Sequence, residues 1–261
     1  MEDNEQMNTM MRRQAILDML QKEHQVKVTD LSQQFGVSEI TIRRDLSDLS
    51  QQYNISRIHG GAVLSQDSIV RIISFEENLI SHKQEKDRIA RKAAEMVEYR
   101  QRIFIDAGST TRLMIDYLDS DLHNVVVTNN LHVASVALQK KSLSVIMLGG
   151  EMLRTANCSS GVVAEEQIKR YQFDFSFLGA AAIGPDGNMY DGYSPEARLK
   201  GTVLKVSSKI FLLADSSKFN TYDLHDFGSL KSIHAVITDE GIDKMARTLL
   251  EKYDVEVIIA K

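Results

Sequence analysis

The sequence predicts an α/β protein of two domains, an N-terminal winged helix-turn-helix and a larger domain built on a mostly parallel sheet. Two short helical patterns meet at Gly36, and a hairpin pattern follows them. In the second half, continuous apolar runs alternate with helical patterns, which is typical of a parallel sheet covered on both faces. A length of 261 residues is too long for one small module and suits two domains.

The composition narrows the class of protein. With 43% hydrophobic and 26% charged residues, the chain is expected to be globular. Its apolar runs are too short to span a membrane, and its N-terminus lacks the apolar core of a signal peptide. Cys158 is the one cysteine, which excludes a disulfide framework or a cysteine-based zinc site. We therefore expect a cytoplasmic protein without a membrane partner.

The first domain is predicted to span residues 11–64. A helix starts at Arg12, an extended piece covers residues 25–28, and Thr29 is expected to cap a second helix that Gly36 ends. A third helix follows directly. Two helices joined by a tight turn that contains glycine form a helix-turn-helix unit.

The third helix is the predicted DNA-recognition element. Ile42, Leu46 and Leu49 share one face at helical spacing and are expected to be buried. The opposite face combines arginine, which contacts guanine or phosphate in a major groove, with apolar and methyl groups that can meet thymine. An ordinary amphipathic helix with a basic tip is the alternative. The predicted DNA contacts on this helix are Ser38, Glu39, Ile40, Thr41, Arg43 and Arg44.

A hairpin pattern completes the first domain. Residues 55–63 read as two short strands around a Gly-Gly turn, which turns the unit into a winged helix. Arg57 and His59 on this wing are further predicted DNA contacts. One observation argues against nucleic acid: the segment 12–64 is nearly neutral, whereas such domains are usually basic.

Three blocks of this domain resemble the DeoR-type family of bacterial transcription regulators. The blocks are residues 13–17, 35–46 and 57–62, in the family's order and spacing. Asn54 stands where such wings usually carry glycine, and asparagine tolerates a positive φ. The resemblance implies that the domain binds double-stranded operator DNA.

Residues 65–80 are mixed and polar and read as a linker to a second domain, residues 81–261. A helix is expected over residues 83–99. The apolar runs predict strands at 103–105, 125–127, 145–148, 175–178, 210–213, 235–237 and 255–259. Helical patterns lie near 111–118, 131–140, 162–171, 196–207 and 243–252.

Small, hydroxyl and acidic residues follow the predicted strands, where open α/β sheets bind their ligands. The segment from Gly108 to Thr111 is the best candidate for a phosphate, because exposed N–H groups at a helix start suit an anion. A plain capped turn is the alternative. Asp106, Asp215 and Lys218 are placed to meet sugar hydroxyls and charge; ordinary turn chemistry, with Lys218 solvated, is the alternative.

This half also resembles the DeoR-type family, through its sensor domain. The matching blocks are residues 106–111, 128–129, 148–150, 177–180, 196–197 with Lys200, and 214–219. The resemblance implies a fold similar to ribose-phosphate isomerases and a phosphorylated sugar or related metabolite as effector. Gly201 departs from the pattern where the family often has arginine. The predicted effector-binding residues are Asp106, Gly108, Ser109, Thr110, Thr111, Thr128, Asn129, Gly149, Gly150, Glu196, Lys200, Asp215 and Lys218.

Together these features predict a repressor of a carbohydrate-utilisation operon that responds to a phosphorylated sugar. A dimer or higher oligomer is expected, because two winged helices on a two-fold axis match a palindromic operator. The alternative is a sugar-phosphate isomerase with a DNA-binding appendage, in which Asp215, Lys218 and Glu196 act as acid, base and stabiliser. We favour the non-enzyme and expect no cofactor, and the histidines show no metal-ligand spacing.

Overall fold

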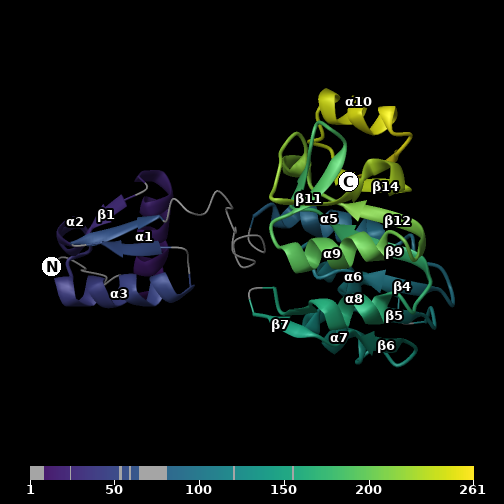
Figure 1. Ribbon diagram of the computed structural model, residues 1–261, viewed down its shortest axis with the longest axis horizontal. Coiled ribbons are helices and arrows are strands. Elements are labelled where there is room, and N and C mark those ends of the chain that lie inside the picture. Colours follow the sequence, from purple (N-terminus) through teal and green to yellow (C-terminus); the bar gives the residue numbers. More distant parts are fainter. Residues whose placement is uncertain are drawn as a thin grey trace. The chain divides into compact units, whose positions relative to one another are not determined.

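The computed structural model describes residues 9–23, 25–52, 55–58, 60–64, 81–119, 121–154 and 156–261. The chain divides into two compact units, residues 1–71 and 72–261 (Figure 1). The predicted linker, 65–80, lies outside the described residues. No helix of the described part is long and apolar enough to cross a membrane.

The N-terminal unit is a winged helix, as predicted. Its helices are α1 (Thr9–Glu23), α2 (Val28–Phe35) and α3 (Glu39–Gln52). The strands β1 (Gln25–Lys27), β2 (Ile55–Ile58) and β3 (Gly61–Leu64) form an antiparallel sheet in the order β1-β3-β2. A Cβ at Gly61 would lie 2.2 Å from the Val26 carbonyl oxygen, so the close pairing of β1 and β3 requires glycine there.

The core of this unit confirms the helix faces predicted from spacing. Ile42, Leu46 and Leu49 of α3 are buried in a cluster with residues of α1 and α2. Gly36 ends α2 in the left-handed conformation, with φ of 63°. The predicted cap of α2 at Thr29 is wrong: the helix begins at Val28, whose side chain is buried in the same core.

The C-terminal unit is built on a seven-stranded parallel sheet in the order β15-β14-β12-β9-β4-β5-β6. Its strands are β4 (Arg102–Ile105), β5 (Val125–Thr128), β6 (Ser144–Met147), β9 (Phe173–Gly179), β12 (Ser207–Leu213), β14 (Ala235–Asp239) and β15 (Glu256–Ala260). All seven match the predicted apolar runs. The smaller strands, which the sequence analysis missed, are β7 (Glu151–Leu153), β8 (Cys158–Ser160), β10 (Ala182–Ile183), β11 (Asn188–Asp191) and β13 (His225–Ser229).

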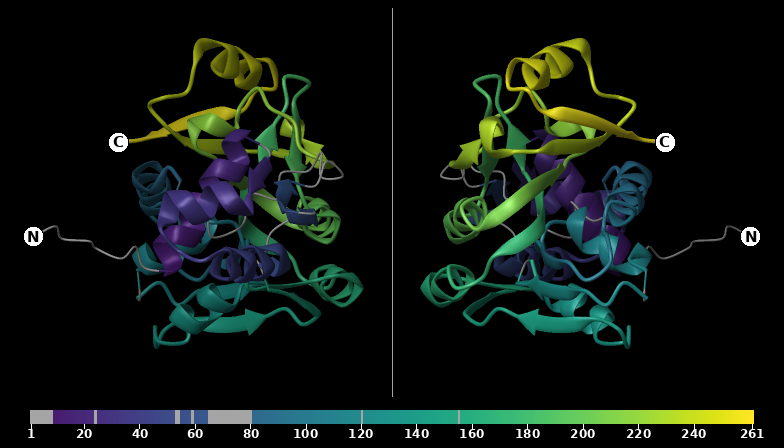
Figure 2. Two further views of the ribbon diagram at one scale, coloured as in Figure 1. Left: turned by 90° about the vertical axis from the view of Figure 1, so that its left-hand side faces the viewer. Right: turned by 90° about the vertical axis from the view of Figure 1, so that its right-hand side faces the viewer.

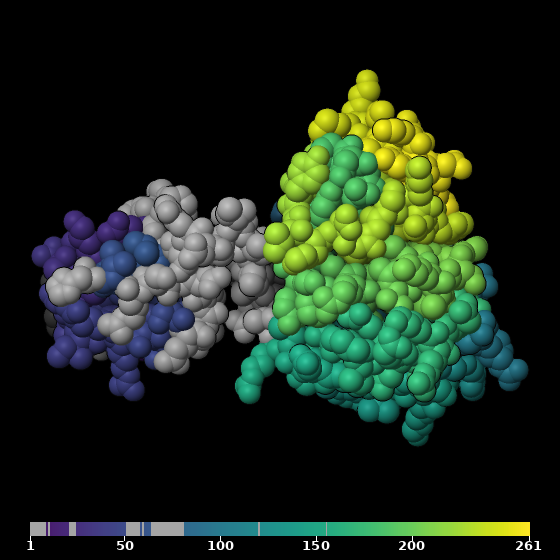
Figure 3. Space-filling model, in the orientation of Figure 1, coloured from purple at the N-terminus to yellow at the C-terminus, as the bar shows by residue number. Residues whose placement is uncertain are grey.

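Helices cover both faces of the sheet. One face carries α5 (Lys83–Ala94), α6 (Met114–Tyr117) and α7 (Leu131–Ala137), and the other α8 (Val162–Ile168), α9 (Ser194–Val203) and α10 (Lys244–Lys252). Figure 2 shows α5 and α9 on opposite sides of the strands. In the space-filling view, α8 in teal and α9 in green form part of the visible surface of this unit (Figure 3).

Alternate residues of the central strands supply the two cores. Phe177 and Phe211 pack toward α5, with ring centroids 5.2 Å apart, whereas Leu178 and Leu212 pack toward α9. This two-sided burial explains why the strands read as continuous apolar runs. The predicted helix over 83–99 is too long, since α5 ends at Ala94.

Candidate functional site

The parallel strands bring the predicted polar loops to one edge of the sheet. Asp106 follows β4, Asn129 follows β5, and Asp215 lies just beyond β12. The register sets Ile105 beside Phe177, so neighbouring strands end close to one another. The carboxyl edge of such a sheet is where ligands bind in open α/β folds.

Lys200 of α9 is the centre of a buried ion cluster at this edge. Its ammonium lies 2.7 Å from the Asp191 carboxylate and 3.3 Å from the Asp106 carboxylate, and it donates to the Gly179 carbonyl at 3.0 Å. Burial alone would lower the pKa of Lys200, but the carboxylates raise it above its ordinary value. Because these three oxygens match its three N–H donors, Lys200 holds α9 to β4, β9 and β11.

Glu196 lies one turn before Lys200 on α9 and faces Cys158. The Cys158 thiol donates to the Glu196 carboxylate, with an Sγ–Oε1 distance of 3.1 Å. Burial raises the pKa of Glu196 to about 7, although Lys200 opposes this shift. Burial likewise raises the pKa of the Cys158 thiol. Burial therefore favours the neutral form of the Glu196 carboxyl.

This shift predicts a pH-dependent contribution to stability. The pKa of this carboxyl is higher in the folded protein than in the unfolded chain. Its contribution to stability is fully present at a pH below the unfolded pKa and is lost as the pH rises toward 7. We expect the melting temperature of the wild type to fall more between pH 5 and pH 8 than that of Glu196→Gln. Equal changes in the two proteins, measured by differential scanning fluorimetry, would contradict the shift.

Three buried polar atoms at the carboxyl edge have no hydrogen-bond partner among the described residues. They are Asn129 Oδ1, Asp215 Oδ2 and Thr238 Oγ1. In two of these residues, another side-chain atom is hydrogen-bonded. Asn129 Nδ2 donates to the Ser159 carbonyl at 3.1 Å, and Asp215 Oδ1 accepts from the Ser217 amide at 3.2 Å. An unsatisfied buried polar atom costs about 1–3 kcal/mol. Three of them at one edge make this edge the candidate ligand site.

The Gly108–Thr111 loop differs in part from its prediction. Thr111 is fully buried, and its hydroxyl donates to the carbonyls of Asp106 and Gly108, both at 3.0 Å. The hydroxyls of Ser109 and Thr110 make no hydrogen bond within the described part of the chain. The expected helix over 111–118 consists of one 3-10 turn, η1 (Thr111–Leu113), followed by the short α6. An anion bound here would therefore be held by backbone N–H groups and two hydroxyls. No long helix begins at this loop to add its dipole.

Three other predicted effector residues have packing roles. The Thr128 hydroxyl donates to the Ile105 carbonyl at 2.7 Å and accepts from the Asn130 amide at 3.0 Å. The Gly149 amide donates to Gln167 at 2.8 Å. A Cβ at Gly150 would lie 2.4 Å from the Ser160 carbonyl oxygen, so this glycine allows a close approach of the chain. Their place in an effector site stays a prediction.

The outward face of α3 carries the predicted DNA contacts. Ile40 is 78% exposed, and Arg44 is exposed with no ion pair among the described residues. Arg43 is also exposed and lies 3.1 Å from the Glu39 carboxylate. Ser38 caps the helix by accepting from the Thr41 amide at 3.2 Å, and its hydroxyl is bonded to that of Thr41. The Arg57 side chain and His59 lie outside the described residues.

The nearly neutral charge of this unit conceals an uneven distribution. Arg12 and Arg13 of α1 each donate to the buried Asp45 carboxylate, at 2.7 and 2.8 Å. Arg13 also pairs with Asp48. The arginines of α1 thus neutralise Asp45 and Asp48 of α3, and the exposed Arg43 and Arg44 of α3 are not used for this.

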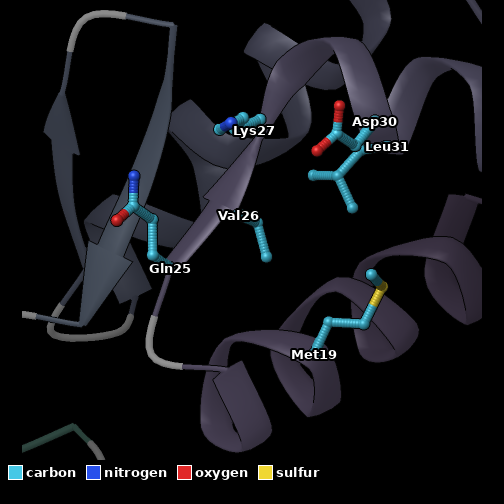
Figure 4. Close-up of a pocket in the computed structure, with 6 residues that line it drawn as sticks. All are labelled: Met19, Gln25, Val26, Lys27, Asp30 and Leu31. Carbon is cyan, nitrogen blue, oxygen red and sulfur yellow. The ribbon is translucent and has the colours of Figure 1, made fainter.

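A pocket in the N-terminal unit lies between α1, β1 and α2 (Figure 4). It is lined by Met19, Gln25, Val26, Lys27, Asp30 and Leu31. None of these is a predicted DNA contact, and we assign the pocket no role.

Two functional candidates were missed by the sequence analysis. Asp191 belongs to β11, a short strand without a clear apolar pattern. Lys86 of α5 is buried, with 1% of its surface exposed. A signal for Lys86 was present, because it precedes Ile89 and Ala90 by three and four residues and so lies in the apolar stripe.

Comparison with known proteins identifies the family. A model described as the DeoR C terminal sensor domain matches residues 81–240, and one described as the DeoR-like helix-turn-helix domain matches residues 12–68. The chain belongs to the DeoR family. It contains both parts of a DeoR-type transcription regulator, a DNA-binding domain and a sensor domain for a small molecule.

Several relatives of this DeoR-family chain match it over nearly their whole length. A candidate repressor of the aga operon from Escherichia coli O157:H7 is 33% identical, covering 95% of this chain and 93% of the relative. The glycerol-3-phosphate regulon repressor of Escherichia coli K12 is 32% identical, covering 87% and 90%. Among solved structures, ribose 5-phosphate isomerase A from Methanocaldococcus jannaschii is 18% identical, covering 53% of this chain and 55% of that one, with a TM-score of 0.38.

Proposed function

We propose that this DeoR-family chain is a repressor of a carbohydrate-utilisation operon. It binds double-stranded operator DNA as a dimer or higher oligomer, and a phosphorylated sugar controls this binding. The observation that carries the proposal is the pairing of two features on one chain. One unit presents Ile40 and Arg44 outward on α3, and the other has, at the carboxyl edge of its sheet, three buried polar atoms without a partner among the described residues. Two relatives support it by their names, one a repressor of the aga operon and the other a repressor of the glycerol-3-phosphate regulon.

The test begins with an operator selected from a random DNA pool by the full chain. Two-fold or repeated half-sites are expected if an oligomer binds. Pentose and hexose phosphates are then added one at a time, and operator affinity, thermal stability and turnover are measured. A compound that shifts stability and operator affinity without turnover supports the sensor.

The enzyme alternative has one observation in its favour, the Glu196 carboxyl whose pKa of about 7 suits proton transfer. We propose a binding role for this group, since the relatives are named as transcription regulators and not as isomerases. In that role the protein is not an enzyme and is expected in the cytoplasm. Isomerisation of any sugar phosphate in the panel, lost in Glu196→Gln, would decide for the alternative.

Arg44→Ala is expected to weaken operator binding by about 1–3 kcal/mol, the range for a bidentate base contact. If Arg44 instead contacts phosphate, the salt dependence of binding falls while sequence preference is kept. Arg43→Ala is the matched comparison, because that guanidinium is already paired with Glu39 on the same helix. Fluorescence anisotropy across a salt series measures both effects. Unchanged affinity in both variants would rule out α3 as the helix in the groove.

The double variant Ser109→Ala with Thr110→Val is expected to abolish the response to the effector and to leave operator binding intact. These hydroxyls make no hydrogen bond within the described chain, so their loss should not disturb the fold. Thr111→Val is the contrasting variant, because its hydroxyl bonds two carbonyls and its loss should lower stability. A double variant that responds at wild-type effector concentrations would show that the phosphate lies elsewhere on the sheet edge.

A further inference from the structure

Strand β6 ends the large sheet on one side, at the lower border of the C-terminal unit in Figure 1, and no strand of the described chain pairs beyond it. Ser144 donates its amide to the Asn124 carbonyl at 2.9 Å, so the backbone groups of Ser144 face β5. Because these groups alternate in direction along a strand, those of Val145 and Met147 face the open edge. The side chains of Val145, Ile146 and Met147 are partly exposed. An apolar edge strand of this kind is a template for another strand.

Helix α7 adds an apolar flank to the same edge. Leu131 and Leu138 are 47% and 72% exposed and share one side of the helix with the exposed Ser135. Along the sheet, α6 borders α7 on one flank, and the open edge beyond β6 lies on the other. Val136 is partly buried in the core that α6 and α7 share, and helical spacing places it on the flank opposite the two leucines. The leucines therefore face the open edge.

The β6 edge is complementary to its own reverse. Antiparallel pairing about a two-fold axis at Ile146 sets Val145 of one copy opposite Met147 of the other, and both have outward backbone groups. The two ends of the strand also differ in charge, because the exposed Lys141 precedes it and the exposed Glu151 follows it. Antiparallel pairing turns the basic end of one copy toward the acidic end of the other, which is favourable.

We propose that two copies of this chain associate through β6 and the leucine flank of α7, so that their two seven-stranded sheets become one. The proposal rests on the oligomer proposed above and adds its surface. A two-fold axis through the middle of β6 keeps equivalent faces of the two sheets together. The two α7 helices then lie side by side and antiparallel, and Leu131 of each copy meets Leu138 of the other.

The opposite edge of the sheet provides a comparison within the same protein. No strand of the described chain pairs beyond β15 either, and Glu256 donates its amide to the His234 carbonyl at 3.4 Å, so the backbone groups of Val257 face outward. Helix α10, which packs against β15, exposes Met245 at 59% but has no pair of exposed leucines. Matched substitutions at β6 and β15 therefore test which edge is used.

Two substitutions at the β6 edge are expected to dissociate the full chain. Val145→Pro removes an outward N–H and spares the bonds to β5, because proline is tolerated on the free side of an edge strand. Leu138→Glu places a carboxylate in the apolar contact between the helices. Sedimentation velocity at micromolar concentration should show a lower oligomeric state for both, with association weakened by at least about tenfold. Val257→Pro and Met245→Glu, the matched changes at β15, should keep the wild-type mass.

A disulfide across the axis tests the register directly. Ile146 would lie opposite itself as a non-hydrogen-bonded pair, in which Cα atoms are about 4.5 Å apart, within the range that a disulfide spans. Under mild oxidation, Ile146→Cys is expected to give a covalent dimer on a non-reducing gel. Ile258→Cys, in the middle of β15, should remain uncrosslinked. The native Cys158 is buried and should not react in either variant.

The outcomes separate this surface from the oligomer itself. A wild type that sediments as a monomer and protects a single half-site refutes both. A wild-type oligomer whose mass is kept in Val145→Pro and Leu138→Glu overturns the surface alone, as when another protein or another segment of the chain covers β6. Dissociation by the β15 variants moves the interface to that edge. If neither β6 variant folds, the cysteine pair decides, and no crosslink through Ile146→Cys overturns the proposal.

Discussion

Replacing Asp45 with alanine is expected to destabilise the N-terminal unit by about 3–5 kcal/mol, the range for removing one partner of a buried ion pair. The Asp45 carboxylate is 3% exposed and accepts from Arg12 and Arg13, at 2.7 and 2.8 Å. Without it, the Arg12 side chain, which is 8% exposed, stays buried with no counter-charge among the described residues. A winged helix of this size has little stability to lose, so operator binding should disappear as well.

Hydrogen–deuterium exchange of α1 and α3 in the full chain measures this loss locally, without requiring the two units to unfold together. Asp48→Ala is the matched control: Asp48 is 38% exposed and pairs with Arg13, so its removal should cost less than about 1 kcal/mol. Replacing the pair together, with Arg12→Met and Asp45→Leu, should recover much of the loss. Protection in Asp45→Ala equal to that in Asp48→Ala would show that the buried pair contributes little.

The same pair explains why composition alone misjudged the first unit. A sum of charges over residues 12–64 is near zero and argues against DNA. The sum cannot tell which charges cancel inside the fold. Asp45 faces Arg12 across 33 positions of the sequence, a distance at which helical spacing gives no information. The local pattern was more reliable, since Ile42, Leu46 and Leu49 fixed the buried face of α3.

In the second unit, the strands of the large sheet were easy to predict because they are buried on both faces. Some residues of the candidate site were hard to predict. The central strands are continuous apolar runs because α5 and α9 cover opposite faces. Strand β11, in contrast, lies in a small three-stranded sheet, where Asn188–Asp191 shows no such run. Asp191 was missed for that reason. Lys86 was missed because helical spacing predicts which positions of α5 are buried but does not predict that a charged side chain is buried at one of them.

The second large effect is expected from Lys200→Met, which should lower the stability of the C-terminal unit by about 3–5 kcal/mol. Methionine fills a similar volume, so the packing of α9 on the sheet is largely kept. Asp106 and Asp191, whose side chains are 1% and 11% exposed, would then share a buried site without a cation. The loss should exceed that of Lys205→Met, an exposed lysine just beyond the end of α9.

The pH dependence of Lys200→Met tests this explanation. Two buried carboxylates without a cation should have raised pKa values, and they can relieve the repulsion by binding a proton. The variant should therefore regain stability as the pH is lowered from 8 to 5, beyond any change in the wild type. Adding Asp191→Asn should restore part of the loss at pH 8, because one of the unpaired charges is removed.

The double variant, Lys200→Met with Asp191→Asn, also tests whether Lys200 contacts the effector directly. If the ammonium belongs to the frame of the site, Lys200→Met with Asp191→Asn should refold the unit and recover effector affinity along with stability. If the ammonium instead binds the phosphate directly, the double variant should recover stability and still fail to bind. The three protein oxygens within 3.3 Å of the Lys200 ammonium favour the first result. Calorimetry of the double variant with the effector found in the sugar-phosphate panel distinguishes the two.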